Sequence, residues 1–320
     1  IINYYQNSWV REHKEETALK IGVILVNYNG KKYNTACIES ILGAETEAEV
    51  TVYVVDNASS DGSMAVLEER YEGNTDLRCI YLDDNYGFSY ANNAGIRKAM
   101  EQGCDVVFLL NNDTEICTDT LQRLLESNRR HPNCVIAPKI YYSDNRKVIW
   151  SAGGASSRIV KKVRHIGLNC EDKGQFDEEK RITFATGCAL WIPVAIIQKA
   201  GLLDERFFLY YEDTEFCFRL GKYNVDIYYC PDAIVYHKVG ASSKGADSPL
   251  CAYYISRNWL LCARKYMSGS RYVVFLLYYG INRMACSLLW LLQGKRDLVK
   301  ASWTGIKDYK KKKTGKSRYY

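Results

Sequence analysis

The sequence has no Cys-x-x-Cys pair, although it contains 12 cysteines in 320 residues. Zinc sites and redox dithiols typically use that spacing, and short secreted chains use closely spaced cysteines as a disulfide framework. Here the cysteines are irregularly spaced along a long chain. We therefore expect free thiols in a reducing cytosol, and neither a zinc site nor a disulfide-stabilised fold.

Two common phosphate-binding loops are also missing. No Gly-x-Gly-x-x-Gly follows the first predicted strand, and no Gly-x-x-x-x-Gly-Lys-Ser/Thr is present, which disfavours a Rossmann dehydrogenase and a P-loop NTPase. A divalent cation is the remaining way to hold a nucleotide diphosphate. Mg²⁺ or Mn²⁺ prefers one or two carboxylates together with phosphate oxygens.

The chain has no net positive charge except at one end. Residues 291–320 contain ten Lys and Arg against Asp297 and Asp308, whereas the whole chain has a net charge of +6, so the preceding residues are slightly acidic. The basic end favours an anionic partner such as a membrane surface. The aromatic residues nearby lie in apolar segments and not in a basic groove, so no nucleic acid partner is expected.

Apolar, β-branched runs alternate with helical segments through the first 130 residues. The predicted strands are 20–29, 50–56, 78–82 and 104–114. This alternation predicts an α/β fold with a mostly parallel sheet flanked by helices. Three of these strands end in polar clusters, where such sheets bind ligands: Asn27-Tyr28-Asn29, Asp56-Asn57 and Asn111-Asn112-Asp113.

Three regions are expected along the chain: an N-terminal extension (1–19), a catalytic domain (20–248) and a C-terminal helical region (249–320) that ends in a basic tail. Within the last region, residues 272–292 approach the length that spans a bilayer. Asn282 and Arg283 near their middle argue against a free transmembrane helix. An interfacial helix, a core or oligomer helix and a true span therefore remain open.

Acidic residues and one histidine are the candidates for chemistry. Asp113 at a strand end suits a metal, although a turn that caps the next helix would have the same residues. Glu212, Asp213 and Glu215 follow the aromatic run 207–211, and an acid beside aromatic side chains is a candidate general base. These acids would equally suit an exposed helix start. His237 ends a strand before a glycine-containing loop, and a single histidine of this kind is more often structural.

Several motifs in order resemble the inverting glycosyltransferases of family 2, which have the GT-A fold, and the rhamnosyltransferase-like members in particular. They are VILVNYNG (23–30), VVDNASSDGS (54–63), NYGFSYANNAGI (85–96), LLNNDT (109–114), the segment 187–219 and the H-x-x-G-x-S segment from His237 to Ser242.

The resemblance implies a role for each matching residue. Asn111-Asn112-Asp113 would occupy the Asp-x-Asp position, with Asp113 and His237 as ligands of Mg²⁺ or Mn²⁺ and with Asn111 replacing the usual first Asp. Asp213 would be the general base. The remaining assignments are donor-side residues Asn27, Tyr28, Asn29, Asp56, Asn85, Gly87, Asn92, Asn93, Asn111 and Asn112, and acceptor-side residues Gly187, Trp191, Glu212 and Arg257.

The expected activity is transfer of a sugar from a nucleotide-sugar donor, with dTDP-rhamnose favoured and a UDP-hexose as alternative. The acceptor would be a saccharide or lipid-linked saccharide at the cytoplasmic face of the plasma membrane, and the possible partners include a second copy of the chain. Two other functions stay open: a catalytically inactive, membrane-associated sugar-binding scaffold and a nucleotidyltransferase. Both Asp113 and Asp213 are present, which disfavours the scaffold, and no basic glycine-rich loop supports the nucleotidyltransferase.

Overall fold

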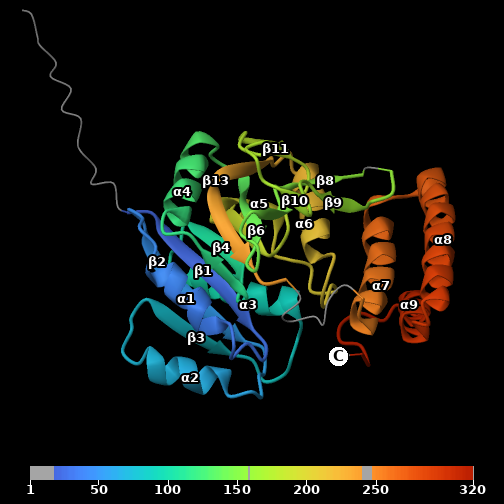
Figure 1. The fold of residues 1–320 in the computed structure, drawn as a ribbon, viewed down its shortest axis with the longest axis horizontal. Helices are drawn as coiled ribbons and strands as arrows, with labels where there is room; N and C mark the ends of the chain where they lie inside the picture. The colour runs from blue at the N-terminus through green and yellow to red at the C-terminus, as the bar shows by residue number, and fades with distance from the viewer. Residues whose placement is uncertain (1–17, 158, 240–246, 320) are drawn as a thin grey trace, which may run out of the picture.

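A computed structural model describes residues 18–157, 159–239 and 247–319 (Figure 1). The predicted N-terminal extension therefore lies outside the described residues except for its last two positions. The same is true of residues 240–242 of the H-x-x-G-x-S segment. Two parts are seen: an α/β domain built on one large sheet, and three C-terminal helices packed beside it.

The predicted sheet is present, and its first half is parallel. β1 (Lys20–Asn27) pairs in parallel with β2 (Glu49–Asp56) and with β4 (Val106–Asn111), and β2 pairs in parallel with β3 (Leu77–Tyr81). The strand order β10-β7-β6-β12-β4-β1-β2-β3 makes β1 and β4 central. Both are buried, apolar strands, because helices cover both faces of the sheet.

The second half of the sheet is mixed. β12 (Ala189–Pro193) is antiparallel to β4, and the long β13 (Ile227–His237) is parallel to β6 (Val135–Tyr142) and antiparallel to β5 (Thr114–Ile116). The remaining strands are short: β7 (Val148–Ser151), β8 (Gly154–Ser156), β9 (Val163–His165), β10 (Cys170–Glu171) and β11 (Lys180–Ile182). This irregular part corresponds to the region where the sequence shows no clear alternation.

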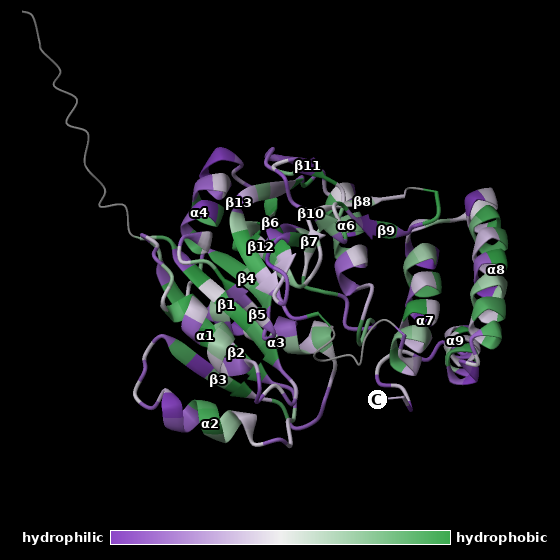
Figure 2. Ribbon diagram, viewed as in Figure 1, coloured by the Kyte–Doolittle hydropathy of each residue, from purple (hydrophilic) through white to green (hydrophobic). Residues whose placement is uncertain are grey.

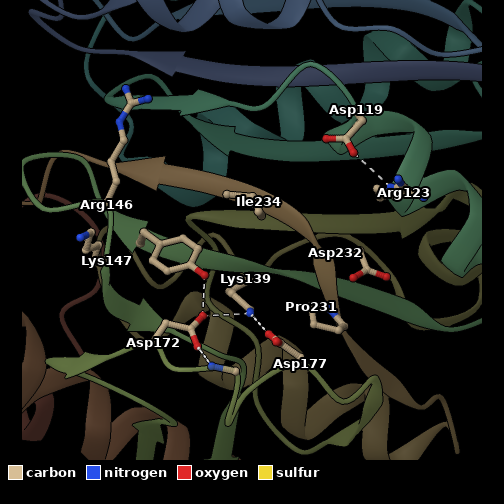
Figure 3. Close-up of a pocket in the computed structure, with 12 residues that line it drawn as sticks. Asp119, Arg123, Lys139, Arg146, Lys147, Asp172, Asp177, Pro231, Asp232 and Ile234 are labelled. Atoms are coloured by element: carbon tan, nitrogen blue, oxygen red, sulfur yellow. Dashed lines mark hydrogen bonds and ion pairs between the residues drawn. The ribbon is translucent and has the colours of Figure 1, made fainter.

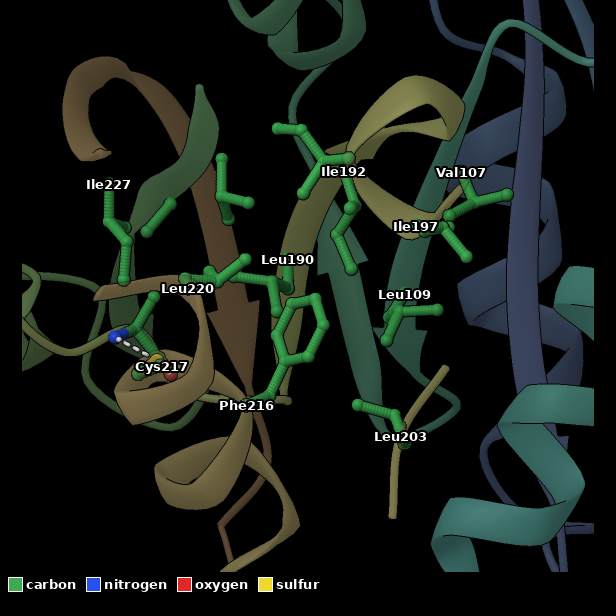
Figure 4. Packing of buried hydrophobic residues seen from close by; sticks show 14 of the residues in the cluster. Val107, Leu109, Leu190, Ile192, Ile197, Leu203, Phe216, Cys217, Leu220 and Ile227 are labelled. Carbon is green, nitrogen blue, oxygen red and sulfur yellow. Dashed lines mark hydrogen bonds between the residues drawn. The ribbon is translucent and has the colours of Figure 1, made fainter. Parts of the chain in front are cut away.

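Two apolar clusters cover the two faces of the sheet. One contains side chains from α1 (Asn34–Leu42), α2 (Ser63–Arg70) and α4 (Thr120–Arg130). The other contains side chains from α3 (Phe88–Glu101), α5 (Val194–Ala200) and α6 (Glu212–Lys222), and Figure 4 shows Phe216 and Leu220 of α6 beside Leu190 of β12. None of the 12 cysteines, all of which lie in the described ranges, forms a disulfide.

The C-terminal region consists of α7 (Pro249–Tyr266), α8 (Gly269–Leu292) and α9 (Arg296–Lys310). Part of the basic end, Arg296–Lys310, forms the helix α9. Leu298 and Ala301 of α9 are buried, and Gly305 passes so close to α7 that an added Cβ would lie 2.4 Å from the Tyr253 carbonyl oxygen. Small residues let the two helices approach, and the surrounding lysines hide that pattern in the sequence.

Arg283 of α8 points into the protein and not into solvent. Its side chain is buried, and its Nη1 donates to Ser256 Oγ of α7 over 3.3 Å. The inward stripe of α8 is Phe275, Tyr279, Arg283 and Ser287. Arg283, which argued against a free transmembrane helix, therefore lies on the face of α8 that packs against protein.

Candidate active site

The polar strand ends come together at one edge of the sheet, as predicted. Asn27 at the end of β1 is in register with Asp56 at the end of β2, and Val26 is in register with Asn111 of β4. Parallel pairing forces this arrangement, because the carboxyl ends of adjacent parallel strands meet at the same edge.

Asn27 is the centre of a buried hydrogen-bond network at this edge. Its Nδ2 lies 2.8 Å from Asp56 Oδ1 and 2.8 Å from Ser63 Oγ, and its Oδ1 accepts from Asn34 Nδ2 over 2.8 Å. Asn112 Nδ2 donates to Asn34 Oδ1 over 2.7 Å, which connects this network to the turn after β4. Asn27 and Asn112, both predicted on the donor side, therefore fix the strand ends.

Asn29 and Tyr28 follow β1 and are at least partly exposed, so they remain available to a donor. Asn29 has a left-handed backbone, φ 55°, and its Oδ1 accepts from the Ser60 N–H over 2.8 Å. The two loops after β1 and β2 are thus joined to each other at the edge where a nucleotide would bind.

Asp113 and His237 are neighbours because β5 pairs with β13. Thr114 is in register with His237, and His237 Nε2 lies 3.3 Å from Asp113 Oδ1. Trp150 packs against the His237 ring with centroids 4.6 Å apart. Burial lowers the pKa of His237, but the nearby Cys188 sulfur and the Asp113 carboxylate outweigh it and raise that pKa to about 10.

The buried polar atoms around Asp113 fit a metal site. Both Asp113 carboxylate oxygens, Asn111 Oδ1 and His237 Nδ1 are buried without a hydrogen-bond partner. His237 Nε2 and Asp113 Oδ1 are close enough for an ion pair, but their geometry is not that of a hydrogen bond. Such groups normally find partners, so a ligand is the simplest explanation.

Within the part of the chain that the structure describes, no cluster of three or more His, Cys, Asp or Glu side chains surrounds one point. Two protein ligands are nonetheless enough for Mg²⁺ or Mn²⁺ when a substrate diphosphate supplies further oxygens. The residues present therefore fit such a cation.

Asp213 lies in the first turn of α6, next to the segment that precedes β12. Its Oδ2 accepts from the Gly187 N–H over 3.2 Å, and its Oδ1 accepts from the Thr214 N–H over 2.6 Å. Burial raises the pKa of Asp213, and these hydrogen bonds reduce the increase. A carboxylate with a raised pKa is better suited to accept a proton near neutral pH.

Cys188, which was not among the predicted site residues, connects the base candidate to the metal candidate. Its carbonyl accepts from the Asn111 N–H over 2.8 Å. Burial raises the pKa of its thiol, His237 lowers that pKa, and both Asp113 and Asp213 raise it. Cys188 therefore lies within electrostatic reach of all three candidate residues, and Gly187 and Cys188 separate Asp213 from the Asp113–His237 pair.

Asn85 is a further candidate for donor contact. It is buried, its Oδ1 accepts from Asn57 Nδ2 over 2.9 Å, and its Nδ2 has no partner. An unpartnered buried donor beside the end of β2 suits a carbonyl or hydroxyl of a nucleotide. Asn57, which was not among the predicted site residues, holds it in place.

Gly87 lets another segment approach its backbone closely, and that segment belongs to the protein itself. It has φ 90°, and an added Cβ would lie 2.4 Å from the Phe208 carbonyl oxygen. The prediction that this glycine lets the donor approach the backbone is therefore wrong, because Phe208 occupies that space.

Asn92 and Asn93 on α3 were predicted to line the donor pocket, and the structure contradicts this. Asn93 is 0% exposed and bonds to the Leu203 carbonyl and to Glu205, while Asn92 Nδ2 donates to the Phe88 carbonyl. Their side chains fasten α3 internally and to the segment before α6. They have no surface on which a donor could bind.

Two predicted acceptor-side residues are also structural. Trp191 is 0% exposed in β12, in the cluster that contains α4, and its Nε1 donates to Asn128. Arg257 of α7 is 1% exposed and donates to the Gly315 carbonyl over 2.9 Å. Both were wrongly placed, because a resemblance between motifs does not reveal which neighbours bury each side chain.

Glu212 and Glu215 differ although both are buried. Glu215 accepts from Lys265, Tyr266 and Arg219, so it is a structural ion-pair residue. Glu212 is next to the base candidate and its Oε2 has no partner. Burial and the Asp213 carboxylate raise the pKa of Glu212 well above its usual range. Glu212 and Gly187 therefore stay candidates for the acceptor side.

Away from the candidate site, a hollow of about 600 Å³ lies on another part of the sheet (Figure 3). Lys139, Asp172 and Asp177 face one another in it, with Lys139 Nζ 3.0 Å from Asp172 Oδ2. None of the predicted site residues lines this hollow. Because its buried lysine is already paired with two carboxylates, the hollow gives no indication of a ligand.

The fold and these motifs agree with known proteins. Residues 22–200 match the model of glycosyl transferase family 2, which is more than half of the chain. A low-salt glycan biosynthesis hexosyltransferase of Haloferax volcanii is 27% identical over 78% of this chain and 77% of that protein. A dTDP-rhamnosyl transferase of Shigella flexneri is 24% identical over 77% and 80% of the two chains.

An N-acetylglucosaminyl-diphospho-decaprenol L-rhamnosyltransferase of Mycobacterium tuberculosis is 24% identical over 76% of this chain and 84% of that protein. Among solved structures, GalNAc-T7 with UDP, GalNAc and Mn²⁺ has a TM-score of 0.60 at 15% identity, covering 83% of this chain and 55% of that one. The structural likeness confirms the GT-A fold. The chain belongs to glycosyl transferase family 2 and is a glycosyltransferase.

Proposed function

We propose that the protein is an inverting glycosyltransferase in which Asp213 is the general base and Asp113 and His237 hold a divalent cation. The observation that carries this proposal is that two adjacent residues connect the two groups: the Gly187 N–H donates to the Asp213 carboxylate, and the Cys188 carbonyl accepts from Asn111, in the turn that holds Asp113 beside His237. In a single displacement, the acceptor hydroxyl and the departing diphosphate lie on opposite sides of the anomeric carbon. The base and the cation are therefore needed at different ends of the site.

The reaction needs one displacement. Asp213 accepts the proton of the acceptor hydroxyl while its oxygen attacks the anomeric carbon, and the bond to the nucleoside diphosphate breaks on the opposite side. A cation held by Asp113 and His237 would neutralise the departing diphosphate. The Gly187 N–H keeps the Asp213 carboxylate oriented, and the anomeric configuration inverts.

The proposed donor is dTDP-rhamnose, with a UDP-hexose as the alternative. Two of the relatives are rhamnosyltransferases, and the name of one specifies dTDP. The partly exposed Tyr28 and the unpartnered Nδ2 of Asn85 at the ends of β1 and β2 are suitably placed for a pyrimidine nucleotide.

A panel of nucleotide sugars tests the donor by thermal shift with Mn²⁺. dTDP-rhamnose is expected to give the largest rise in Tm, because a ligand at 100 times its Kd stabilises the folded state by about 2.7 kcal/mol. The shift should require Mn²⁺, and a proton NMR spectrum of the product should show the inverted anomer. A larger shift with a UDP-hexose would reassign the donor, and a retained anomer would contradict the single displacement.

The proposed acceptor is a lipid-linked saccharide, reached by an enzyme bound peripherally to the cytoplasmic face of the plasma membrane. α8 supports membrane binding, since it alone among the described helices has the length and apolarity of a membrane span, and hydrophobic residues recur along it (Figure 2). Its exposed stripe is Val273, Val274, Leu277, Ile281, Met284, Leu288 and Leu292.

An interfacial position fits α8 better than a span. The opposite stripe of the helix, with Tyr279 and Arg283, is packed against α7 and is not available to lipid. The lysines at 310–313 end α9 and follow it, and each basic residue near an anionic leaflet contributes about 1 kcal/mol. One apolar face beside basic residues is typical of a helix that lies in the membrane surface.

Flotation with phosphatidylglycerol vesicles tests this surface. The variant Leu277→Asp with Ile281→Asp is expected to lower vesicle binding at least about tenfold, since burying each apolar side chain contributes about 1.5–3 kcal/mol. Leu168→Asp, at another exposed leucine outside α8, is the matched control and should bind normally. Equal binding by the α8 variant would contradict membrane contact. A wild-type dimer without lipid that the same variant dissociates would assign the face to a second copy.

A further inference from the structure

The segment before the proposed base has an unusual backbone. Tyr210 and Tyr211 are consecutive non-glycine residues with positive φ, 64° and 76°. This left-handed region is unfavourable for residues with a Cβ, because the Cβ approaches the following carbonyl oxygen. Tyr211 is the N-cap of α6, so the strained pair determines where the first turn of that helix, with Asp213, begins.

A single side chain of α7 holds this segment. Asn258 Nδ2 donates to the Leu209 carbonyl over 2.9 Å and to the Tyr210 carbonyl over 2.7 Å. Its Oδ1 accepts from Arg257 Nε over 2.9 Å, which fixes the orientation of the amide. Asn258 is 0% exposed, so water does not replace these hydrogen bonds.

Other α7 contacts surround the same segment. Tyr254 stacks on Phe208 with centroids 5.5 Å apart, and Lys265 pairs with Glu215 one turn after the start of α6. α7 lies between the α/β domain and α8 (Figure 1). A strained conformation persists only where the surroundings determine it fully, and here the surroundings are the polar face of α7.

We propose that Asn258 is a positioning residue for glycosyl transfer, which holds the Leu209 and Tyr210 carbonyls so that α6 presents the Asp213 carboxylate to the acceptor hydroxyl. The inference rests on the proposed role of Asp213 as the base. It gives the C-terminal helical region a part in the reaction, because the α/β domain alone does not determine the start of α6. It also explains why an amide is present there: two donors are needed for two carbonyls, and one acceptor for Arg257.

The test compares two substitutions in the full-length enzyme. Asn258→Asp keeps the shape but removes both donors, and it is expected to lower kcat about 10- to 100-fold, the loss that a displacement of about 1 Å causes. The KM for the nucleotide sugar should change by less than threefold, since the donor site at the ends of β1 and β2 does not contact Asn258. Asn258→Ser keeps one donor and should give a smaller loss of kcat.

Tyr279→Phe is the matched control, because it removes a buried hydrogen bond between α8 and the Ser256 carbonyl of α7 and leaves the hydrogen bonds from Asn258 to the strained segment in place. Its kcat should stay near the wild-type value at a similar change in Tm. The inference is overturned if the Asn258 variants lose no more kcat than this control, or if their donor KM rises as much as kcat falls.

Asp213→Asn in the same assay separates the two proposals. If Asp213→Asn is inactive while Asn258→Asp behaves like the control, the positioning role fails and the base survives. If Asp213→Asn turns over normally, the assignment of the base itself fails. If Asn258→Asp does not fold, Asn258→Ser decides the question by the same comparison, the loss of kcat against the change in donor KM.

Discussion

Asp213→Asn is expected to lower kcat by about 10²- to 10⁴-fold, the range that a positioned general base contributes. Asparagine keeps the size of the side chain, and its amide oxygen can still accept from the Gly187 N–H, now 3.2 Å from the carboxylate. It does not accept a proton at neutral pH. Donor binding should remain unchanged, because the candidate donor residues lie at the ends of β1, β2 and β4.

Transfer is measured at saturating donor, and donor binding is measured by calorimetry with Mn²⁺. Asp232→Asn is the matched control, since Asp232 is an exposed acid at the second hollow and not at the proposed site. Turnover close to wild type in Asp213→Asn would remove Asp213 from the role of base. A parallel loss of donor affinity would instead indicate that the carboxylate also shapes the donor site.

The same residue gives a direction for the pH profile. The base works only when it is deprotonated, and burial raises the pKa of Asp213. The acid limb of kcat should therefore lie at higher pH than about 3.9, the value of an ordinary Asp. Glu212 is the adjacent buried carboxyl, and its own pKa is raised further by the Asp213 charge, so the two carboxyls titrate as a coupled pair.

The sheet and the convergence of strand ends could be predicted from the sequence, because both follow from local patterns. The apolar runs that end in Asn27, Asp56 and Asn111 can be recognised in the sequence itself, and parallel pairing brings their polar ends together. The pairing of Asp113 with His237 was expected only from the family resemblance. It depends on the antiparallel contact between β5 and β13, which joins residues more than 100 positions apart.

The errors arise where the deciding contact is distant in sequence. Asn93 belongs to a motif that looks like a helix start near a ligand, yet the Leu203 carbonyl and Glu205 occupy its side chain. The left-handed pair Tyr210 and Tyr211 has no local signal, because tyrosine has no preference for that region. The contacts that hold this segment come from α7 and α3, both distant from it in sequence.

Asp113→Ala is expected to abolish the part of donor binding that depends on metal. Asp113 has an ion pair with His237 over 3.3 Å, and neither of its carboxylate oxygens accepts a hydrogen bond within the described structure, so the fold should survive its removal. Calorimetry with a nucleoside diphosphate should show an affinity gain from Mn²⁺ in the wild type and none in the variant. A loss of at least about 10- to 100-fold is expected, since changes one shell further out already cost that much.

Asn111→Asp adds a carboxylate where Asp113→Ala removes one, so it provides a second test of the metal site. Asn111 Oδ1 is buried in the same turn without a partner, so a carboxylate there adds a charged ligand close to Asp113. We expect half-saturation at a lower Mn²⁺ concentration than in the wild type. An Asp113→Ala enzyme with unchanged Mn²⁺-dependent affinity would contradict the metal site. If Asn111→Asp fails to tighten Mn²⁺ while Asp113→Ala abolishes its effect, the cation is held on the His237 side of Asp113.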